Sequence, residues 1–244
     1  MDENFGKLGI QDFFNVLFNG ALFVICAYWI FPKILDRYFD FKANNEKEAY
    51  AILLVVFFAI GLIIQEFAQI CDRHIFHIKM NAERNFLKKK YKNVCIGGRS
   101  KNHIIGNKNK LKKYRKMGKK ILKEKGFKFS NEFTGAQSTY IYAVCYYTVE
   151  NCGRSSKYEK MRGLFDMSVS LSFSCIVLEF LSIISGLLCL WNHDIKLSMI
   201  IQILVFGVGI VIFNNRAKVI MNYKVRMLME TYCCCKENAK KKNA

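Results

Sequence analysis

Four long apolar segments constrain the fold of this chain more than any other feature of its sequence. They lie at about residues 13–31, 50–70, 167–191 and 197–213. A transmembrane helix needs roughly 20 apolar residues, within a range of about 17–25, and all four segments fit. The alternative, four buried helices of a soluble protein, is disfavoured because a soluble domain of this size rarely holds several such helices. The sequence therefore predicts an all-α integral membrane protein with four transmembrane helices.

The net charge of +19 is concentrated outside these segments. Residues 73–165 hold 24 Lys and Arg against 5 Asp and Glu, and residues 214–244 hold 8 against 2. Because positive flanks stay in the cytoplasm, we expect a multi-pass protein of the inner (plasma) membrane with both termini cytoplasmic. The predicted parts are an N-terminal transmembrane hairpin, a strongly basic helical cytoplasmic domain, a C-terminal transmembrane hairpin and a basic cytoplasmic tail, at residues 1–72, 73–165, 166–213 and 214–244.

Aromatic residues and cysteines fit this topology. Trp29 and Trp191 fall at the predicted outer ends of their spans, where interfacial aromatic residues concentrate. None of the ten cysteines falls in a predicted external loop, which indicates reduced thiols rather than a disulfide framework. Gly20 and Ala21 are expected to allow close helix contact in the first span. Pro32, the only proline, is expected to end or bend that helix.

Local patterns predict that helices continue beyond the spans. We expect the second span to run on through residues 73–92, and a basic helix to cover about residues 111–125 before Gly126. Ser156 with Glu159 forms a capping-box pattern that would start a helix leading directly into the third span. These expectations describe a cytoplasmic domain that is mechanically tied to the membrane helices.

A stripe of small and polar residues marks one face of the third span. Seven residues recur at alternating spacings of four and three, which places them on one helix face: Ser168, Ser172, Cys175, Glu179, Ser182, Gly186 and Cys189. Glu179 stands about 18 Å from the start of the span by helical rise, close to the bilayer midplane. A carboxylate there costs roughly 2.5 kcal/mol or more, so it needs a partner or water.

Two interpretations of this stripe stay open. It either lines an ion or proton pathway, where a ring of carboxylates in an oligomer would favour cations, or forms a helix contact. Glu66 near the cytoplasmic end of the second span and Gln202 in the fourth belong to the same candidate set of pore or helix-contact residues.

Basic residues of the central domain are candidates for contact with an anionic ligand or lipid. The interpretations are attraction to anionic membrane lipid, phosphate contacts to a nucleotide or nucleic acid, or a solvated surface that only sets topology. The candidate residues are Arg99, Lys101, Lys112, Lys113, Arg115, Lys116, Lys119 and Lys120.

Motifs for catalysis, cofactors or metals are not found in the sequence, so no enzyme activity and no cofactor are predicted. Cys71, His74 and His77 are spaced three apart, which spreads them over a wide arc of a helix and makes a metal site there unconvincing.

Two functions remain as hypotheses at this stage. The first is a homo-oligomeric four-span protein that forms or gates an ion pathway. Small multispan membrane effectors of bacterial anti-phage defence systems have a similar general layout, which is an analogy of architecture alone. The second is a non-conducting membrane anchor whose basic domain recruits a protein, nucleotide, nucleic acid or anionic lipid.

Overall fold

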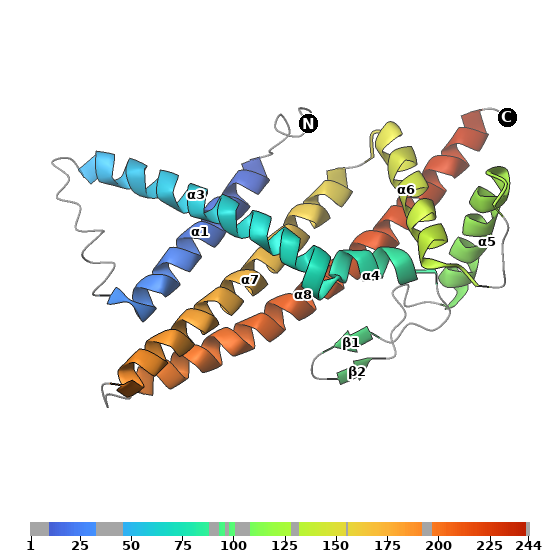
Figure 1. Ribbon diagram of the computed structural model, residues 1–244. Coiled ribbons are helices and arrows are strands. Elements are labelled where there is room, and N and C mark those ends of the chain that lie inside the picture. Colours follow the sequence, from blue (N-terminus) through green and yellow to red (C-terminus); the bar gives the residue numbers. More distant parts are fainter. Residues whose placement is uncertain are drawn as a thin grey trace. The chain divides into compact units, whose positions relative to one another are not determined.

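The computed structural model describes residues 10–32, 46–87, 93–95, 98–100, 108–127, 132–154, 156–191 and 197–242. The described chain is helical apart from one small β-hairpin (Figure 1). Its elements in chain order are α1 (Ile10–Ile30), α3 (Glu46–Cys71), η2 (Asp72–Phe76), α4 (Ile78–Asn85), β1 (Asn93–Cys95), β2 (Gly98–Ser100), α5 (Lys108–Glu124), α6 (Gly135–Asn151), α7 (Ser156–Trp191) and α8 (Leu197–Lys242).

Four of these helices are long and apolar enough to cross a membrane, as the sequence predicts. They are α1, α3, α7 and α8. The α1 helix ends at Ile30, two residues before Pro32, because proline disfavours helical backbone in the residue that precedes it. This confirms the predicted effect of Pro32.

Two compact units divide the chain. The first, which we call the apolar unit, comprises residues 1–72 and 166–216, and the second, the basic unit, comprises residues 73–165 and 217–244. Each of the long helices α7 and α8 contributes to both. The stretch that follows the fourth apolar segment therefore belongs to the same compact unit as the central basic segment.

Helices α1 and α3 of the apolar unit cross with their backbones in direct contact (Figure 1). A Cβ atom added at Gly20 would lie 1.8 Å from the carbonyl oxygen of Phe57, and one at Gly61 would lie 2.0 Å from that of Val16. No side chain fits in either place, so only glycine permits this approach. The predicted close contact at Gly20 is confirmed.

Helix α7 is a single helix of 36 residues, and α8 is a single helix of 46 residues. The prediction that a helix starting near Ser156 leads directly into the third span is confirmed. In the apolar unit, Leu178 of α7 and Phe206 of α8 form a buried cluster with Ile30. Further along the same unit, Phe67 of α3 stacks on Phe173 of α7 with ring centroids 6.3 Å apart.

The second predicted span does not continue as one regular helix, so that prediction is wrong. The backbone widens into a π-helix over Asp72–Phe76, and His77 then takes a left-handed conformation with φ of 51° before α4 begins. A left-handed residue breaks the right-handed helical path, and α4 ends at Asn85. Residues 88–92, at the end of the expected helix, lie outside the described residues.

The core of the basic unit is formed by apolar residues from several helices. Leu87, Leu122 and Ile141 are fully buried. A Cβ at Gly118 of α5 would lie 3.0 Å from the Cδ1 atom of Ile141 and 3.3 Å from that of Leu87, so glycine lets α5 pack closely. The buried face of the second half of α8 adds Met221, Val225, Leu228, Met229 and Tyr232.

Local capping sets the start of α6. Thr134 accepts a hydrogen bond from the backbone N–H of Gln137, while the Gln137 side chain accepts one from the backbone N–H of Thr134. This reciprocal capping box stabilises the helix start.

The two strands β1 and β2 pair antiparallel, with Val94 opposite Arg99.

Candidate functional sites

The stripe on α7 lies partly in the interior of the apolar unit. Ser168, Ser172 and Ser182 are buried, whereas Cys175 and Glu179 are half-buried. Around Gly186 there is open space, since no atom would lie within 4 Å of an added Cβ. The side chain of Cys189 lies outside the described residues. The seven residues therefore do not share one environment.

The middle of the stripe faces α8. A Cβ at Gly207 would lie 3.3 Å from the Oε1 atom of Glu179, and one at Gly209 would lie 2.8 Å from the sulfur of Cys175. These glycines leave room for the two polar side chains. Among the described residues, Glu179 forms no ion pair. Its carboxylate therefore lies beside backbone on an apolar helix, without a countercharge from the described chain.

Three buried serine hydroxyls of α7 lack a hydrogen-bond partner among the described residues. They belong to Ser170, Ser172 and Ser174. Ser182 differs, because its hydroxyl donates to the carbonyl oxygen of Leu178 at 2.9 Å. A hydroxyl buried in an apolar environment without a hydrogen bond costs roughly 1–3 kcal/mol by protein mutational data. Because the chain itself encloses these atoms, water or an ion inside the unit would remove that cost.

Sequence reasoning found Ser172 but missed Ser170 and Ser174. Both lie off the predicted stripe, on a part of α7 that was expected to be bulky and apolar. The alternating Ser168, Ser170, Ser172 and Ser174 was the available signal. A spacing of two residues turns about 200° around a helix, so Ser168 and Ser172 lie on one side of α7 and Ser170 and Ser174 on the nearly opposite side.

Gln202 and Glu66 occupy different environments within the apolar unit. Gln202 is buried, and its Nε2 atom donates to the backbone carbonyl of Trp29 at 3.1 Å. That bond satisfies a carbonyl at the end of α1, so Gln202 holds α8 against α1. Glu66 of α3 is exposed on the surface of the chain.

A second site lies in the basic unit between α5 and the last turns of α8. It is an open groove of about 500 Å³, which is within the roughly 300–1,000 Å³ typical of small-molecule sites. We call it the basic groove. Its lining includes six lysines, namely Lys113, Lys116, Lys119, Lys120, Lys123 and Lys236.

The pattern of α5 explains why these lysines gather in one place. Leu111, Tyr114, Gly118 and Ile121 are buried at successive spacings of three, four and three, and the adjacent Leu122 is buried as well. This pattern gives the helix one buried face. The α5 lysines that line the groove fall on the remaining arc and are exposed. Folding of the apolar face thus presents the lysines together on the opposite side.

Two glutamates moderate the charge of the basic groove. Lys113 lies 3.5 Å from Glu237, which joins α5 to α8, and Lys120 lies 3.9 Å from Glu124. All four side chains are more than half exposed, so each pair contributes at most about 1 kcal/mol to stability. Six lysines against two glutamates leave an excess of four positive charges in the lining.

Two other predicted basic residues, Arg115 and Lys112, are not part of the basic groove. Arg115 is buried, where it donates to the carbonyl of Leu87 at 2.9 Å and stacks 5.3 Å from the centre of the Phe133 ring. Lys112 is exposed on α5 but is not part of the lining. The backbone of Arg99 lies in β2, while its side chain and all of Lys101 lie outside the described residues.

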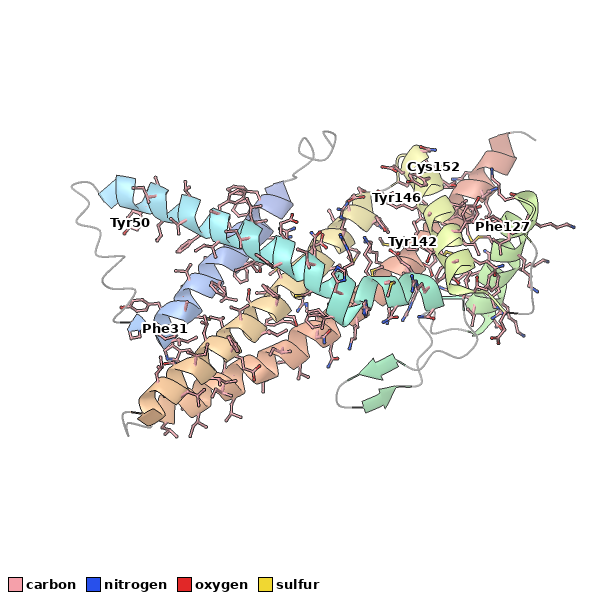
Figure 2. The ribbon with its side chains drawn as sticks, in the orientation of Figure 1. Phe31, Tyr50, Phe127, Tyr142, Tyr146 and Cys152 are labelled. Carbon is pink, nitrogen blue, oxygen red and sulfur yellow. The ribbon has the colours of Figure 1, made fainter. Side chains whose placement is uncertain are left out.

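A buried tyrosine pair connects α6 to the first turn of α7 in the basic unit. The hydroxyls of Tyr142 and Tyr158 are hydrogen-bonded to each other, and Lys224 of α8 lies 4.4 Å from the centre of the Tyr158 ring. Figure 2 shows Tyr142 and Tyr146 along α6, where Tyr146 in turn donates to Glu159 at 3.4 Å. Burial, followed by the charge of Tyr158, raises the pKa of Tyr142 far above 10, so this hydroxyl stays protonated.

Metal ligands do not cluster in the part of the chain that the structure describes, where no three His, Cys, Asp or Glu side chains come together. Comparisons of the chain with protein-family models, with characterised proteins and with solved structures find no match. Functional conclusions therefore depend on the chemistry of the two sites alone.

Proposed function

We propose that this chain is a membrane protein that assembles as a homo-oligomer and forms or gates an ion pathway. The observation that carries the proposal is the set of buried α7 hydroxyls that have no partner among the described residues, on the same helix as the half-buried Glu179. A membrane interior offers no water of its own to satisfy such groups. Water in a pathway along α7 supplies the missing hydrogen bonds, and a permeating cation supplies the countercharge for Glu179.

The proposed topology places the basic unit in the cytoplasm together with both termini. Its support is the distribution of charge, since residues 73–165 hold 24 basic against 5 acidic residues and positive segments are retained inside. In this orientation the apolar residues exposed on the surface of the apolar unit, such as Phe180 and Leu187, meet lipid or a neighbouring copy. Reporter fusions to the C-terminus test the orientation, and an external C-terminus would refute it.

Ion flux from liposomes that contain the purified full chain tests the pathway. We expect flux from wild-type protein and a change of at least severalfold in Glu179→Gln, because the substitution removes the charge while keeping the shape. Glu159→Gln is the matched control, since it makes the same substitution in the first turn of the same helix, outside the third apolar segment. Equal flux from the wild type and Glu179→Gln would assign Glu179 a structural role.

The alternative function is a non-conducting anchor whose basic unit recruits a partner. The basic groove favours it, because an excess of positive charge in a concave surface attracts anions regardless of what the membrane helices do. The liposome experiment separates the two functions. Correctly inserted, oligomeric protein that gives no flux with or without added nucleotides would support the anchor and exclude the pathway.

A further inference from the structure

We propose that the basic groove binds a small soluble molecule that carries two or more phosphate groups. This inference does not depend on conduction by the apolar unit, because every residue that it uses lies in the basic unit. The groove's volume of about 500 Å³ fits a ligand of nucleotide size. The four excess positive charges match a ligand with several negative charges better than one with a single charge.

Lysines that are available to a ligand stand next to lysines that are already paired. In the described residues, no carboxylate lies within ion-pair distance of Lys116 or Lys123, although both line the groove. A lysine ammonium presents three donors on a flexible stem and bonds phosphate as a point charge. Several such groups around one hollow suit clustered phosphates.

The groove also has an apolar wall, which phosphate binding alone does not explain. Met117 and Ile121 of α5 and Tyr232 of α8 line it between the lysines, and the sulfur of Met117 lies 3.7 Å from that of Cys233. Mostly apolar walls with a few polar groups are typical of sites that hold an organic ligand. We therefore infer that the ligand joins its phosphates to an organic body, as nucleotides do.

The shape of the groove favours a discrete soluble ligand over a bilayer surface. Anionic lipids attract basic residues from a flat plane of headgroups, whereas these lysines converge on a hollow. Glu124 and Glu237 also line that hollow, and their carboxylates would oppose a continuous anionic surface. A compact ligand can contact the lysines while avoiding both carboxylates.

Substitution of Glu237 is expected to change ligand affinity in the opposite direction from substitution of a lysine. Its carboxylate lies 3.5 Å from Lys113, so it competes with a ligand phosphate for that lysine. Removing its charge should strengthen binding, whereas removing a lysine should weaken it. A nonspecific loss of folding cannot produce both results.

Calorimetric titration of the full chain in phosphatidylcholine nanodiscs tests this inference, with inorganic tripolyphosphate and adenosine triphosphate as probes. We expect saturable binding at one site that Lys116→Gln weakens about tenfold and that Glu237→Gln strengthens about threefold. Lys112→Gln is the matched control, because it removes the same charge from the same helix outside the lining. We expect tighter binding of adenosine triphosphate than of tripolyphosphate.

Several results would overturn the proposal. Absence of saturable binding by either probe would do so, as would an equal loss of affinity in Lys112→Gln and Lys116→Gln, which indicates diffuse attraction. Binding only to nanodiscs that contain phosphatidylglycerol would assign the lysines to lipid, and binding only to duplex DNA would assign them to nucleic acid. Weaker binding in Glu237→Gln would also contradict the described geometry.

Discussion

The two units of the molecule treat their buried polar groups differently. In the basic unit, the hydroxyls of Tyr142 and Tyr158 bond to each other and Arg115 bonds the carbonyl of Leu87. In the apolar unit, hydroxyls on α7 such as that of Ser172 are buried without a partner among the described residues. Among the described residues, the buried side-chain atoms of the basic unit without a partner are Ser138 Oγ and His77 Nδ1. Because unsatisfied buried groups are costly, the apolar unit, where three such hydroxyls lie close together on α7, has the greater need of enclosed water or an ion.

The largest predicted effect tests what holds the apolar unit together. Gly20→Ala places a Cβ 1.8 Å from the carbonyl oxygen of Phe57, so α1 and α3 must separate at a cost of about 3 kcal/mol or more. Gly186→Ala is the control, since open space surrounds that position. Unfolding of the full chain in detergent by increasing denaturant measures both. Equal stability of the two variants would contradict a close backbone contact between α1 and α3 at Gly20.

The next effect tests the internal bonding of the basic unit. Arg115→Met removes a buried donor from the Leu87 carbonyl and the stacking on Phe133, for a loss of about 2 kcal/mol. Lys112→Met on the exposed face of the same helix should change stability by less than about 0.5 kcal/mol. The same unfolding measurement compares them. If Lys112→Met is as damaging as Arg115→Met, the assigned difference between the two faces of α5 is wrong.

A smaller, pH-dependent effect is expected at the tyrosine pair. Tyr142→Phe leaves the hydroxyl of Tyr158 without its bond, which costs about 1 kcal/mol at neutral pH. Because burial raises the folded-state pKa of Tyr142 above the ordinary 10, stability is fully present below pH 10 and falls as pH rises further. Unfolding monitored from pH 8 upward should show a shallower alkaline decline in Tyr142→Phe. Tyr147→Phe, at an exposed residue of the same helix, should retain the wild-type decline.

The smallest effect on stability is expected at a serine whose hydroxyl has no partner among the described residues. It tests directly whether the two units differ in their buried hydroxyls. Ser172→Ala removes a hydroxyl that has no partner within the described chain, so stability should change by less than about 0.5 kcal/mol or should rise. Liposome flux should nevertheless change, since the hydroxyl is proposed to contact water. A loss of stability as large as that of Tyr142→Phe, without a change in flux, would mean that Ser172 has a protein partner.

Features that depend on local composition were predictable from the sequence. Long apolar runs gave four helices suited to a membrane, and the position of Pro32 gave the end of α1. Gly20 was identified because small residues permit close helix contact. Its partner Gly61 was not, because a contact between α1 and α3 depends on which turns of two distant segments meet.

Features that depend on tertiary packing were not predictable. Arg115 stands within a run of lysines, and only the packing of α5 shows that it points inward to Leu87. The basic groove needs Tyr232 and Lys236 from the far end of the chain, which no spacing within α5 reveals. The π-helix at Asp72–Phe76 also has no signal as strong as a proline or glycine in that segment.

In the proposed function, α7 lines an ion pathway that contains Glu179. The most direct measurement is the reversal potential of currents through the full chain in a planar bilayer with unequal KCl on the two sides. A carboxylate in the pathway favours cations, so we predict a cation-selective potential for the wild type and a shift toward zero for Glu179→Gln. The same reversal potential in both proteins, or no current from correctly assembled wild-type protein, would contradict the claim.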